Sequence, residues 1–384
     1  MMSGVERAVE DVVRRVQRRI GADADRDEVA ELARRESARR AEQGRAGRDT
    51  AVPDERALER SALAALLGYG ALQPLLDDPA VEEIWINSPR AVFASAGGVT
   101  RRVPLELTAQ AVRETVERML QTTGRRLDLS SPFVDASLPD GSRLHVVIPD
   151  ITAGDWAVNI RKFLRGTGDI DALVGRGMIP ADVVGYLRGR VAAGGSIVVS
   201  GSTHTGKTTL LGAMLTSLCA TERILTVEET FELSIRVPDR VGLQGREANL
   251  EGSGAVDLRR LIREALRMRP DRLVVGEVRG AEALDLLIAV NTGVPGGCTV
   301  HANSAGDALR KLTLLPLLAG TTVDRGFVVE CIAAGIDTVV HLERDRDGAR
   351  RVAEVAHPEL GDGGLTARTV YRAEQVPGTR EGRP

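Results

Sequence analysis

The feature that most constrains the fold is a glycine-rich loop between an apolar run and a helical segment. Residues 201–208 read GSTHTGKT, which matches the pattern G-x-x-x-x-G-K-[ST]. The run before the loop is SIVVSG, and the segment after it is KTTLLGAMLTSLC. Glycines let backbone N–H groups turn inward around phosphate groups, and the helix N-terminus adds positive potential. The motif therefore predicts a phosphate-binding loop at the end of a buried strand.

Side chains of this loop have expected roles toward a bound ATP. Lys207 is expected to bridge the β- and γ-phosphates, and the hydroxyl of Thr208 to bind Mg²⁺. The chain has 51 basic residues and only three are lysines, so a lysine inside the motif is seldom a chance event. We interpret His204 as a tolerated spacer residue rather than a catalyst. The expected nucleotide-binding residues are Gly201, Ser202, Thr203, His204, Thr205, Gly206, Lys207, Thr208 and Thr209.

The patterning along the 384 residues indicates more than one domain. Short apolar runs alternate with helical segments in the C-terminal half, which predicts a parallel sheet with helices on both faces. The N-terminal helices are rich in arginine and glutamate, and we interpret them as a solvated arm rather than a partner-binding element. The predicted segments are a helical extension (1–59), a smaller α/β domain (60–163), a linker (164–180), a P-loop α/β domain (181–360) and a flexible tail (361–384).

Composition excludes several classes of protein. The net charge is -3 with a pI near 6.1, and only 3% of residues are aromatic, so we expect no DNA-binding groove or base-stacking platform. Three cysteines without CxxC spacing exclude a disulfide scaffold and a zinc ribbon. No run reaches the 18 apolar residues of a membrane span, and the N-terminus lacks the apolar region of a signal peptide. We therefore expect a cytoplasmic protein that reaches the membrane only through partners.

Acidic residues and a histidine follow the other apolar runs of the C-terminal half. Glu228 and Glu229 follow ILTV, Glu277 follows RLVVG, and His301 follows CTV. Ligands of open α/β sheets bind at these carboxyl ends, so the acids are candidates for orienting Mg²⁺ and water. Two interpretations stay open for His301, a structural residue before the next helix and a sensor of the γ-phosphate.

Four motifs in order resemble the secretion traffic ATPases, the hexameric RecA-like motors of type II secretion, type IV pili and type IV secretion. The resemblance covers residues from about 60 to 355 and is strongest to the CpaF type of Tad/Flp-like pili. The upstream segment SPFVDASLPDGSRLHVVIPD also resembles that group's N-terminal domain. The four motifs are GSTHTGKTT, TVEETFEL, LRMRPDRLVVGEVRGAEALDLLIAVNTG and TVHANSAGDAL.

This resemblance implies roles for the strand-end residues. Glu228 falls at the catalytic glutamate of the acidic box, and Glu277 at the acid of the Walker B motif, where it joins Thr208 as a Mg²⁺ ligand. His301 matches the histidine of the His box. Many relatives have a second histidine after the Thr-Gly of the helix that follows Walker B, whereas residues 292–295 read TGVP here. His301 is therefore expected to act alone.

The resemblance also implies arginines that reach the phosphates from the N-terminal domain. Arg143 in the DGSR turn and Arg161 in IRK match those positions, and Arg126 is a weaker match. Such arginines would let ATP hold the two domains together, and hydrolysis would release them about the 164–180 linker, whose glycines suit a hinge.

The leading hypothesis is an ATP- and Mg²⁺-dependent homohexameric motor for Tad/Flp-like pilus assembly or protein secretion. It would lie at the inner face of the cytoplasmic membrane, on an inner-membrane platform protein. One alternative is an ATPase of type IV secretion or conjugation. Another is a nucleotide-gated scaffold with little turnover, against which the complete set of Lys207, Thr208, Glu228 and Glu277 argues. Pilus assembly, secretion and retraction are not separated by the sequence.

Overall fold

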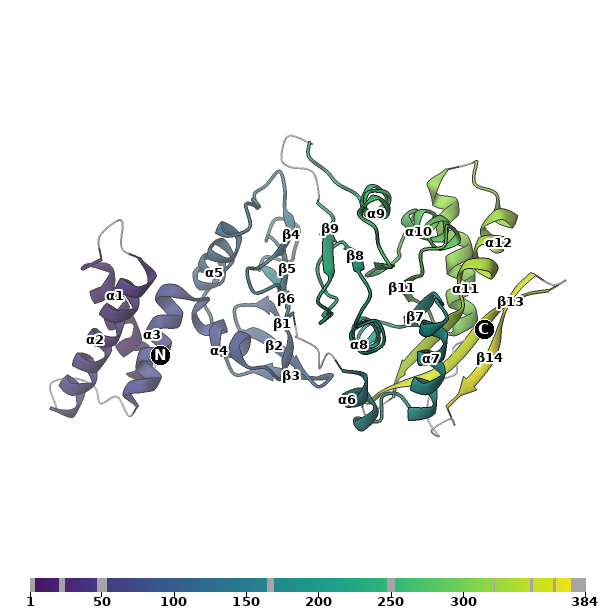
Figure 1. The fold of residues 1–384 in the computed structure, drawn as a ribbon. Coiled ribbons are helices and arrows are strands. Elements are labelled where there is room, and N and C mark those ends of the chain that lie inside the picture. The colour runs from purple at the N-terminus through teal and green to yellow at the C-terminus, as the bar shows by residue number, and fades with distance from the viewer. Residues whose placement is uncertain are drawn as a thin grey trace. The chain divides into compact units, whose positions relative to one another are not determined.

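The computed structural model divides into two compact units, residues 1–164 and 165–384 (Figure 1). The structure describes residues 4–20, 25–46, 54–163, 169–246, 253–320, 322–345, 348–361 and 364–373.

Unit 1 begins with three helices that pack on one another: α1 (Gly4–Gln17), α2 (Arg26–Arg45) and α3 (Glu55–Leu67). Asp25 starts α2 because its side chain accepts a hydrogen bond from the Glu28 N–H at 2.8 Å, which satisfies one of the unpaired donors of the first turn. The prediction of a solvated arm is wrong in one respect, because the helices form a bundle with its own apolar core. That core consists of Ala8, Val12, Val16, Val29, Ala33, Leu58 and Ala62.

The rest of unit 1 is a six-stranded antiparallel sheet in the order β3-β2-β1-β6-β5-β4. Its strands are β1 (Val81–Ser88), β2 (Ala91–Ala96), β3 (Val99–Val103), β4 (Phe133–Ser137), β5 (Arg143–Val147) and β6 (Ala157–Arg161). Three helical segments accompany them: η1 (Gly70–Leu72), α4 (Gln73–Asp77) and α5 (Ala109–Gln121).

One face of this sheet is buried and the other is open. Alternate residues such as Ile84, Leu144 and Ile160 are fully buried, together with Val116 and Met119 of α5. The period of two along each strand places the intervening polar and aromatic residues on the opposite face. Unit 1 therefore presents a row of polar and aromatic side chains across the strands of its open face.

Unit 2 is an eight-stranded sheet in the order β14-β13-β12-β7-β11-β10-β8-β9, in which the six strands from β12 to β9 run parallel. The parallel strands are β7 (Ile197–Gly201), β8 (Ile224–Glu228), β9 (Arg240–Gln244), β10 (Arg272–Val275), β11 (Gly296–His301) and β12 (Thr338–Arg344). The antiparallel strands are β13 (Arg350–Gly361) and β14 (Gly364–Arg372).

Helices cover both faces of this sheet, which confirms the predicted α/β class. The helical segments are α6 (Ile170–Gly175), α7 (Ala181–Ala192), α8 (Lys207–Leu218), α9 (Leu258–Ala265), η2 (Leu266–Met268), α10 (Glu282–Asn291), α11 (Ala305–Leu314), η3 (Leu315–Ala319) and α12 (Arg325–Gly335). One apolar core contains α9 to α12, and a second contains α6, α7 and α8. Val198 belongs to the first core and Val199 to the second, because successive side chains of a strand point to opposite faces.

Two predicted segments differ from the structure. The second half of the predicted linker folds as α6, and Ile170, Leu173 and Ile179 are buried in the core with α7 and α8. The linker glycines at 166 and 168 lie outside the described residues. In the predicted tail, β14 pairs with β13 over residues 364–372, while residues 374–384 lie outside the described residues. No residue of β14 is buried, so the strand has no fully buried face, and the sequence prediction did not include this hairpin.

Candidate nucleotide site

The phosphate loop connects β7 to α8 with the backbone that its glycines require. Gly206 adopts a left-handed conformation with φ 91° immediately before the helix. A Cβ atom on Gly201 would lie 2.6 Å from the Leu342 carbonyl oxygen, so only glycine fits where the loop leaves the strand. Thr205 is buried, and its hydroxyl donates a hydrogen bond to the Ser202 carbonyl at 2.9 Å. The loop is therefore stabilised by a hydrogen bond between two of its own residues.

His204 is one of two non-glycine residues with positive φ in the part of the chain that the structure describes. Its φ is 61° and its side chain is exposed. A non-glycine residue in this conformation costs about 1–2 kcal/mol. The interpretation of His204 as a spacer residue stays a prediction.

Lys207 is held at the first turn of α8. The residue is only 7% exposed. Its ammonium donates a hydrogen bond to the Ser202 carbonyl at 2.9 Å and lies 3.2 Å from His301 Nδ1. The N–H groups of the first helical turn add to the positive potential here.

Glu277, His301 and Lys207 form one cluster at the carboxyl edge of the parallel sheet. His301 ends β11 directly beside Gly201 of β7, so the two residues are paired in the sheet register. His301 Nε2 lies 2.7 Å from Glu277 Oε1. Because the Lys207 ammonium can only donate, His301 Nδ1 accepts from it and the ring proton is on Nε2, the nitrogen nearer the carboxylate. The structure thus brings three of the predicted site residues together.

Arg279 is a further member of this cluster that the sequence analysis did not select. Its guanidinium donates a hydrogen bond to Glu277 Oε2 at 2.6 Å and another to Glu229 Oε2 at 3.3 Å. An arginine two residues after a strand-end acid was the available signal, because both side chains of such a pair can reach the same edge of the sheet.

The environment of Glu277 favours its charged form. Burial acts to raise the pKa of Glu277, but the hydrogen bond and charge of Arg279, with the Lys207 ammonium and the polar His301 ring, outweigh burial and lower the pKa below its ordinary value. The pKa of His301 is lowered by burial and by the charge of Lys207. The site therefore holds an ionised carboxylate beside a neutral imidazole.

The environment of Glu228 is the opposite. Its side chain is 2% exposed at the end of β8, and Oε2 accepts hydrogen bonds from the N–H groups of Glu232 at 2.7 Å and Leu233 at 2.8 Å. Burial raises the pKa of Glu228, and these backbone hydrogen bonds oppose the rise only in part. A Cβ on Gly276 would lie 2.7 Å from Glu228 Cγ, so Glu228 packs directly against the segment that carries Glu277.

The residues present fit a magnesium ion bound with nucleotide phosphates. The Thr208 hydroxyl and the Glu277 carboxylate are oxygen donors of the kind that Mg²⁺ prefers. Glu277 Oε1 is buried, and His301 Nε2 lies 2.7 Å from it without the geometry of a hydrogen bond. When bound, the ion supplies positive charge to the phosphate oxygens.

The predicted arginines lie on the open face of the unit 1 sheet. Arg161 of β6 is the register partner of Arg143 of β5 and of Glu83 of β1. Arg143 Nη2 donates a hydrogen bond to Asp135 Oδ1 at 3.3 Å. These two arginines belong to unit 1, whereas the phosphate loop belongs to unit 2, so their contact with a nucleotide stays a prediction. Arg126 is exposed in the connection between α5 and β4.

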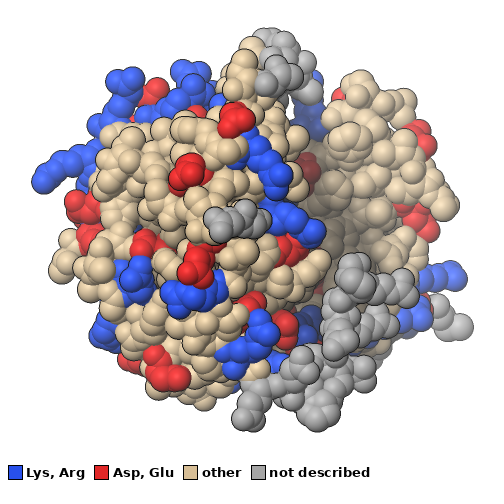
Figure 2. Space-filling model, turned by 90° about the vertical axis from the view of Figure 1, so that its right-hand side faces the viewer, with Lys and Arg blue, Asp and Glu red and all other residues tan. Residues whose placement is uncertain are grey.

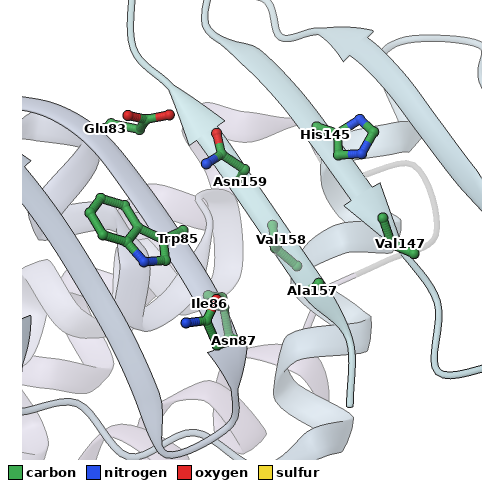
Figure 3. A pocket seen from close by; sticks show the side chains of 9 residues that line it. All are labelled: Glu83, Trp85, Ile86, Asn87, His145, Val147, Ala157, Val158 and Asn159. Carbon is green, nitrogen blue, oxygen red and sulfur yellow. The ribbon is translucent and has the colours of Figure 1, made fainter. Parts of the chain in front are cut away.

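A shallow pocket lies beside these arginines on the same sheet (Figure 3). Trp85, Asn159 and His145 line it in one row across β1, β6 and β5, because they are successive register partners. Trp85 stacks on Phe93 of the neighbouring strand, with ring centroids 5.7 Å apart and planes 12° from parallel. The open face therefore combines an aromatic platform with polar groups.

No helix among the described residues is both long and apolar enough to cross a membrane.

Comparisons with known proteins match most of the chain. A family model described as "Type II/IV secretion system protein" matches residues 66–359. A Mycobacterium tuberculosis protein (strain CDC 1551 / Oshkosh) named "Putative conjugal transfer protein MT3759" is 40% identical over 318 residues, which cover 81% of this chain and 90% of that protein. The "Conjugal transfer protein TrbB" of Rhizobium radiobacter is 33% identical over 292 residues, which cover 74% of this chain and 85% of that protein.

A solved structure shares the fold. The X-ray structure of the Legionella pneumophila ATPase DotB aligns with 73% of this chain and 78% of its own, at a TM-score of 0.54 and 18% identity. At that identity the likeness concerns the fold alone. The expected fold class, a RecA-like P-loop domain preceded by a smaller α/β domain, is confirmed.

Proposed function

The chain belongs to the type II/IV secretion system protein family, and from this premise we propose that it is an ATP-hydrolysing motor of type IV secretion or conjugation. The observation that carries this proposal is the convergence of Lys207, Glu277 and His301 at the end of the phosphate-loop strand. The relatives named as conjugal transfer proteins favour this class over the Tad/Flp-like pilus that the sequence resemblance led us to expect.

We propose that the phosphate loop binds the ATP triphosphate. The backbone N–H groups of residues 201–209 surround the phosphates, and Lys207 neutralises the β- and γ-phosphates after leaving its contact with the Ser202 carbonyl. Thr208 and Glu277 hold the Mg²⁺ of the bound nucleotide. His301 contacts both Lys207 and Glu277, so its position depends on whether a γ-phosphate is bound, and as the last residue of β11 it passes that change to the strand.

The two acids take different roles because their environments separate their pKa values. Glu277, with its lowered pKa, stays ionised as a metal ligand. Glu228, with its raised pKa, is suited to accept a proton from the attacking water, since a general base works best with a pKa near the operating pH. The water oxygen bonds to the γ-phosphorus as the bond to the ADP oxygen breaks. Glu228 must turn from the Glu232 and Leu233 N–H groups to reach that water.

The proposed assembly is a homohexamer on an inner-membrane platform protein. Six copies of the 41.1 kDa chain give about 247 kDa. We propose no DNA contact, because acidic and basic side chains are interspersed on the face drawn in Figure 2 and the net charge is -3. Salt-dependent DNA binding would contradict this part. Prepilin genes next to the gene for this chain would instead favour a role in assembly of a Tad/Flp-like pilus.

ATP turnover by the purified chain, measured with Mg²⁺ and with EDTA, tests the proposal. Turnover that needs Mg²⁺ supports a motor. Tight nucleotide binding without turnover supports the nucleotide-gated scaffold instead.

A further inference from the structure

Arg279 lies between two carboxylates that follow different strands. One nitrogen of its guanidinium is 2.6 Å from Glu277 Oε2, and the other terminal nitrogen is 3.3 Å from Glu229 Oε2. Glu229 follows β8 and Glu277 follows β10, and these strands are neighbours in the sheet. The guanidinium therefore bridges the two acids, and Glu229 still holds it if it leaves Glu277.

The backbone of Arg279 is held by hydrogen bonds, and its side chain is partly exposed. Both the Arg279 and the Gly280 N–H groups donate hydrogen bonds to Glu282 Oε1, at 2.6 and 2.7 Å. The preceding Val278 N–H donates to the Thr299 carbonyl at 2.9 Å. The side chain of Arg279 is 48% exposed, compared with 22% for Glu277. A rotation of the guanidinium from one acid to the other thus needs no backbone movement.

Arg279 and a magnesium ion compete for the same negative charge. Glu277 carries one negative charge and is already surrounded by the Arg279 guanidinium, the Lys207 ammonium and the His301 imidazole. A divalent cation on this carboxylate would be repelled by the guanidinium a few ångströms away, because like charges at that distance interact strongly where water is partly excluded. The repulsion falls when Arg279 moves to Glu229.

We propose that Arg279 is a positioning residue that changes its carboxylate partners: it pairs with both Glu277 and Glu229 before nucleotide binds and is held by Glu229 alone when Glu277 takes the magnesium ion. The inference rests on the proposed function, because it assigns Glu277 to the metal. Arg279 then restrains Mg²⁺ binding in the empty site, and Glu229 relieves that restraint.

The test compares the affinity of a fluorescent ADP derivative, mant-ADP, in MgCl₂ and in EDTA. The ratio of the two dissociation constants measures how much Mg²⁺ strengthens binding. We expect Arg279→Gln to increase the Mg²⁺ advantage by about two- to fivefold, the range of a partly exposed ion pair. Glu229→Gln removes the second acceptor and should reduce the advantage by a similar factor. Arg279→Lys keeps the charge and should resemble the parent.

A double-mutant cycle provides the decisive comparison. In the Arg279→Gln background, Glu229→Gln should change the Mg²⁺ advantage no further, since Glu229 acts only through the arginine. Arg368→Gln is the matched control, because Arg368 pairs with Glu359 at 3.6 Å on the β13–β14 hairpin. The control should leave the ratio at the parent value.

Two results would overturn the inference while leaving the proposed function intact. In both cases the parent chain would bind mant-ADP more tightly with Mg²⁺. In the first, Arg279→Gln would reduce this Mg²⁺ advantage, as expected of a residue that contacts phosphate. In the second, Glu229→Gln would change the advantage equally in the parent chain and in the Arg279→Gln variant. A parent chain that binds mant-ADP equally in MgCl₂ and EDTA contradicts the magnesium site itself, and both proposals fail together.

Discussion

The two sheets of the molecule present their polar side chains in different ways. In the parallel sheet of unit 2, the strands are buried on both faces, and Glu228, Glu277 and His301 follow the carboxyl ends of three of them. In the antiparallel sheet of unit 1, Arg143 and Arg161 stand on an open face, side by side across two strands. The polar side chains of unit 2 cluster at one edge of its sheet, whereas those of unit 1 lie across one face of its sheet.

This difference has a physical consequence for electrostatics. At the edge of unit 2, burial changes the pKa of each acid, raising that of Glu228 and opposing the charged neighbours of Glu277. On the open face of unit 1, Arg143 pairs with Asp135 where both side chains are about one-third exposed, so water screens the pair. The edge of the unit 2 sheet can change the pKa values of its acids, whereas the arginines on the open face of the unit 1 sheet stay exposed enough to contact a charged group.

The largest effect should come from the buried acid of the edge. Glu228→Gln should bind nucleotide but hydrolyse ATP about 10²–10⁴-fold more slowly, the usual contribution of a general base. Turnover and mant-ADP binding, measured on the same preparation, separate the two effects.

Glu277→Gln is the comparison for that variant. It should lose turnover together with the Mg²⁺ advantage in binding, because it removes a metal ligand. If Glu277→Gln alone slows hydrolysis and Glu228→Gln does not, the assignment of Glu228 as the base is wrong.

A smaller effect is expected from the open face. Arg161→Ala and Arg143→Ala should each lower turnover by about 10²-fold, the cost of losing one donor to a developing charge, with a much smaller change in nucleotide affinity. Arg102→Ala, on β3 of the same sheet, is the control for removing an arginine. Parent rates in both Arg161→Ala and Arg143→Ala would show that the face takes no part in catalysis.

The smallest effect concerns the packing beneath the edge. Gly276→Ala should lower the free energy of unfolding by about 1–3 kcal/mol, because its Cβ would lie 2.7 Å from Glu228 Cγ in a packed site. Gly189→Ala in α7 is the matched control: apart from the helix's own backbone, no atom of the described residues lies within 4 Å of its Cβ, and alanine favours a helix by about 0.5–1 kcal/mol. Thermal unfolding should therefore shift in opposite directions for the two variants.

The carboxyl edge of the unit 2 sheet could be predicted from the sequence better than the open face of the unit 1 sheet. Parallel strands buried on both sides are continuous apolar runs, and each motif residue follows one of them, so β7, β8, β10 and β11 were expected. β9 was missed because only Val241 and Leu243 of its five residues pack against the core. Helices α1 and α2 were taken for a solvated arm because the core they share with α3 uses alanine and valine between many charged residues.

Contacts between distant residues were beyond sequence reasoning. The hydrogen bonds of Glu228 to the Glu232 and Leu233 backbone depend on how the β8–β9 connection turns back. The bridge from Arg279 to Glu229 depends on β8 and β10 being adjacent, although 50 residues separate the two side chains in the chain. Strand order and loop path, rather than residue type, determine both.

The measurement that tests the account most directly is ATP turnover by the parent chain and by Lys207→Ala. The account predicts Mg²⁺-dependent hydrolysis by the parent and a loss of at least about 10²–10³-fold in the variant, because the ammonium stabilises charge that develops on the phosphates. Circular dichroism of the variant should match the parent, which excludes unfolding as the cause. Hydrolysis by folded Lys207→Ala at the parent rate would contradict the claim that this edge of the sheet is the catalytic site.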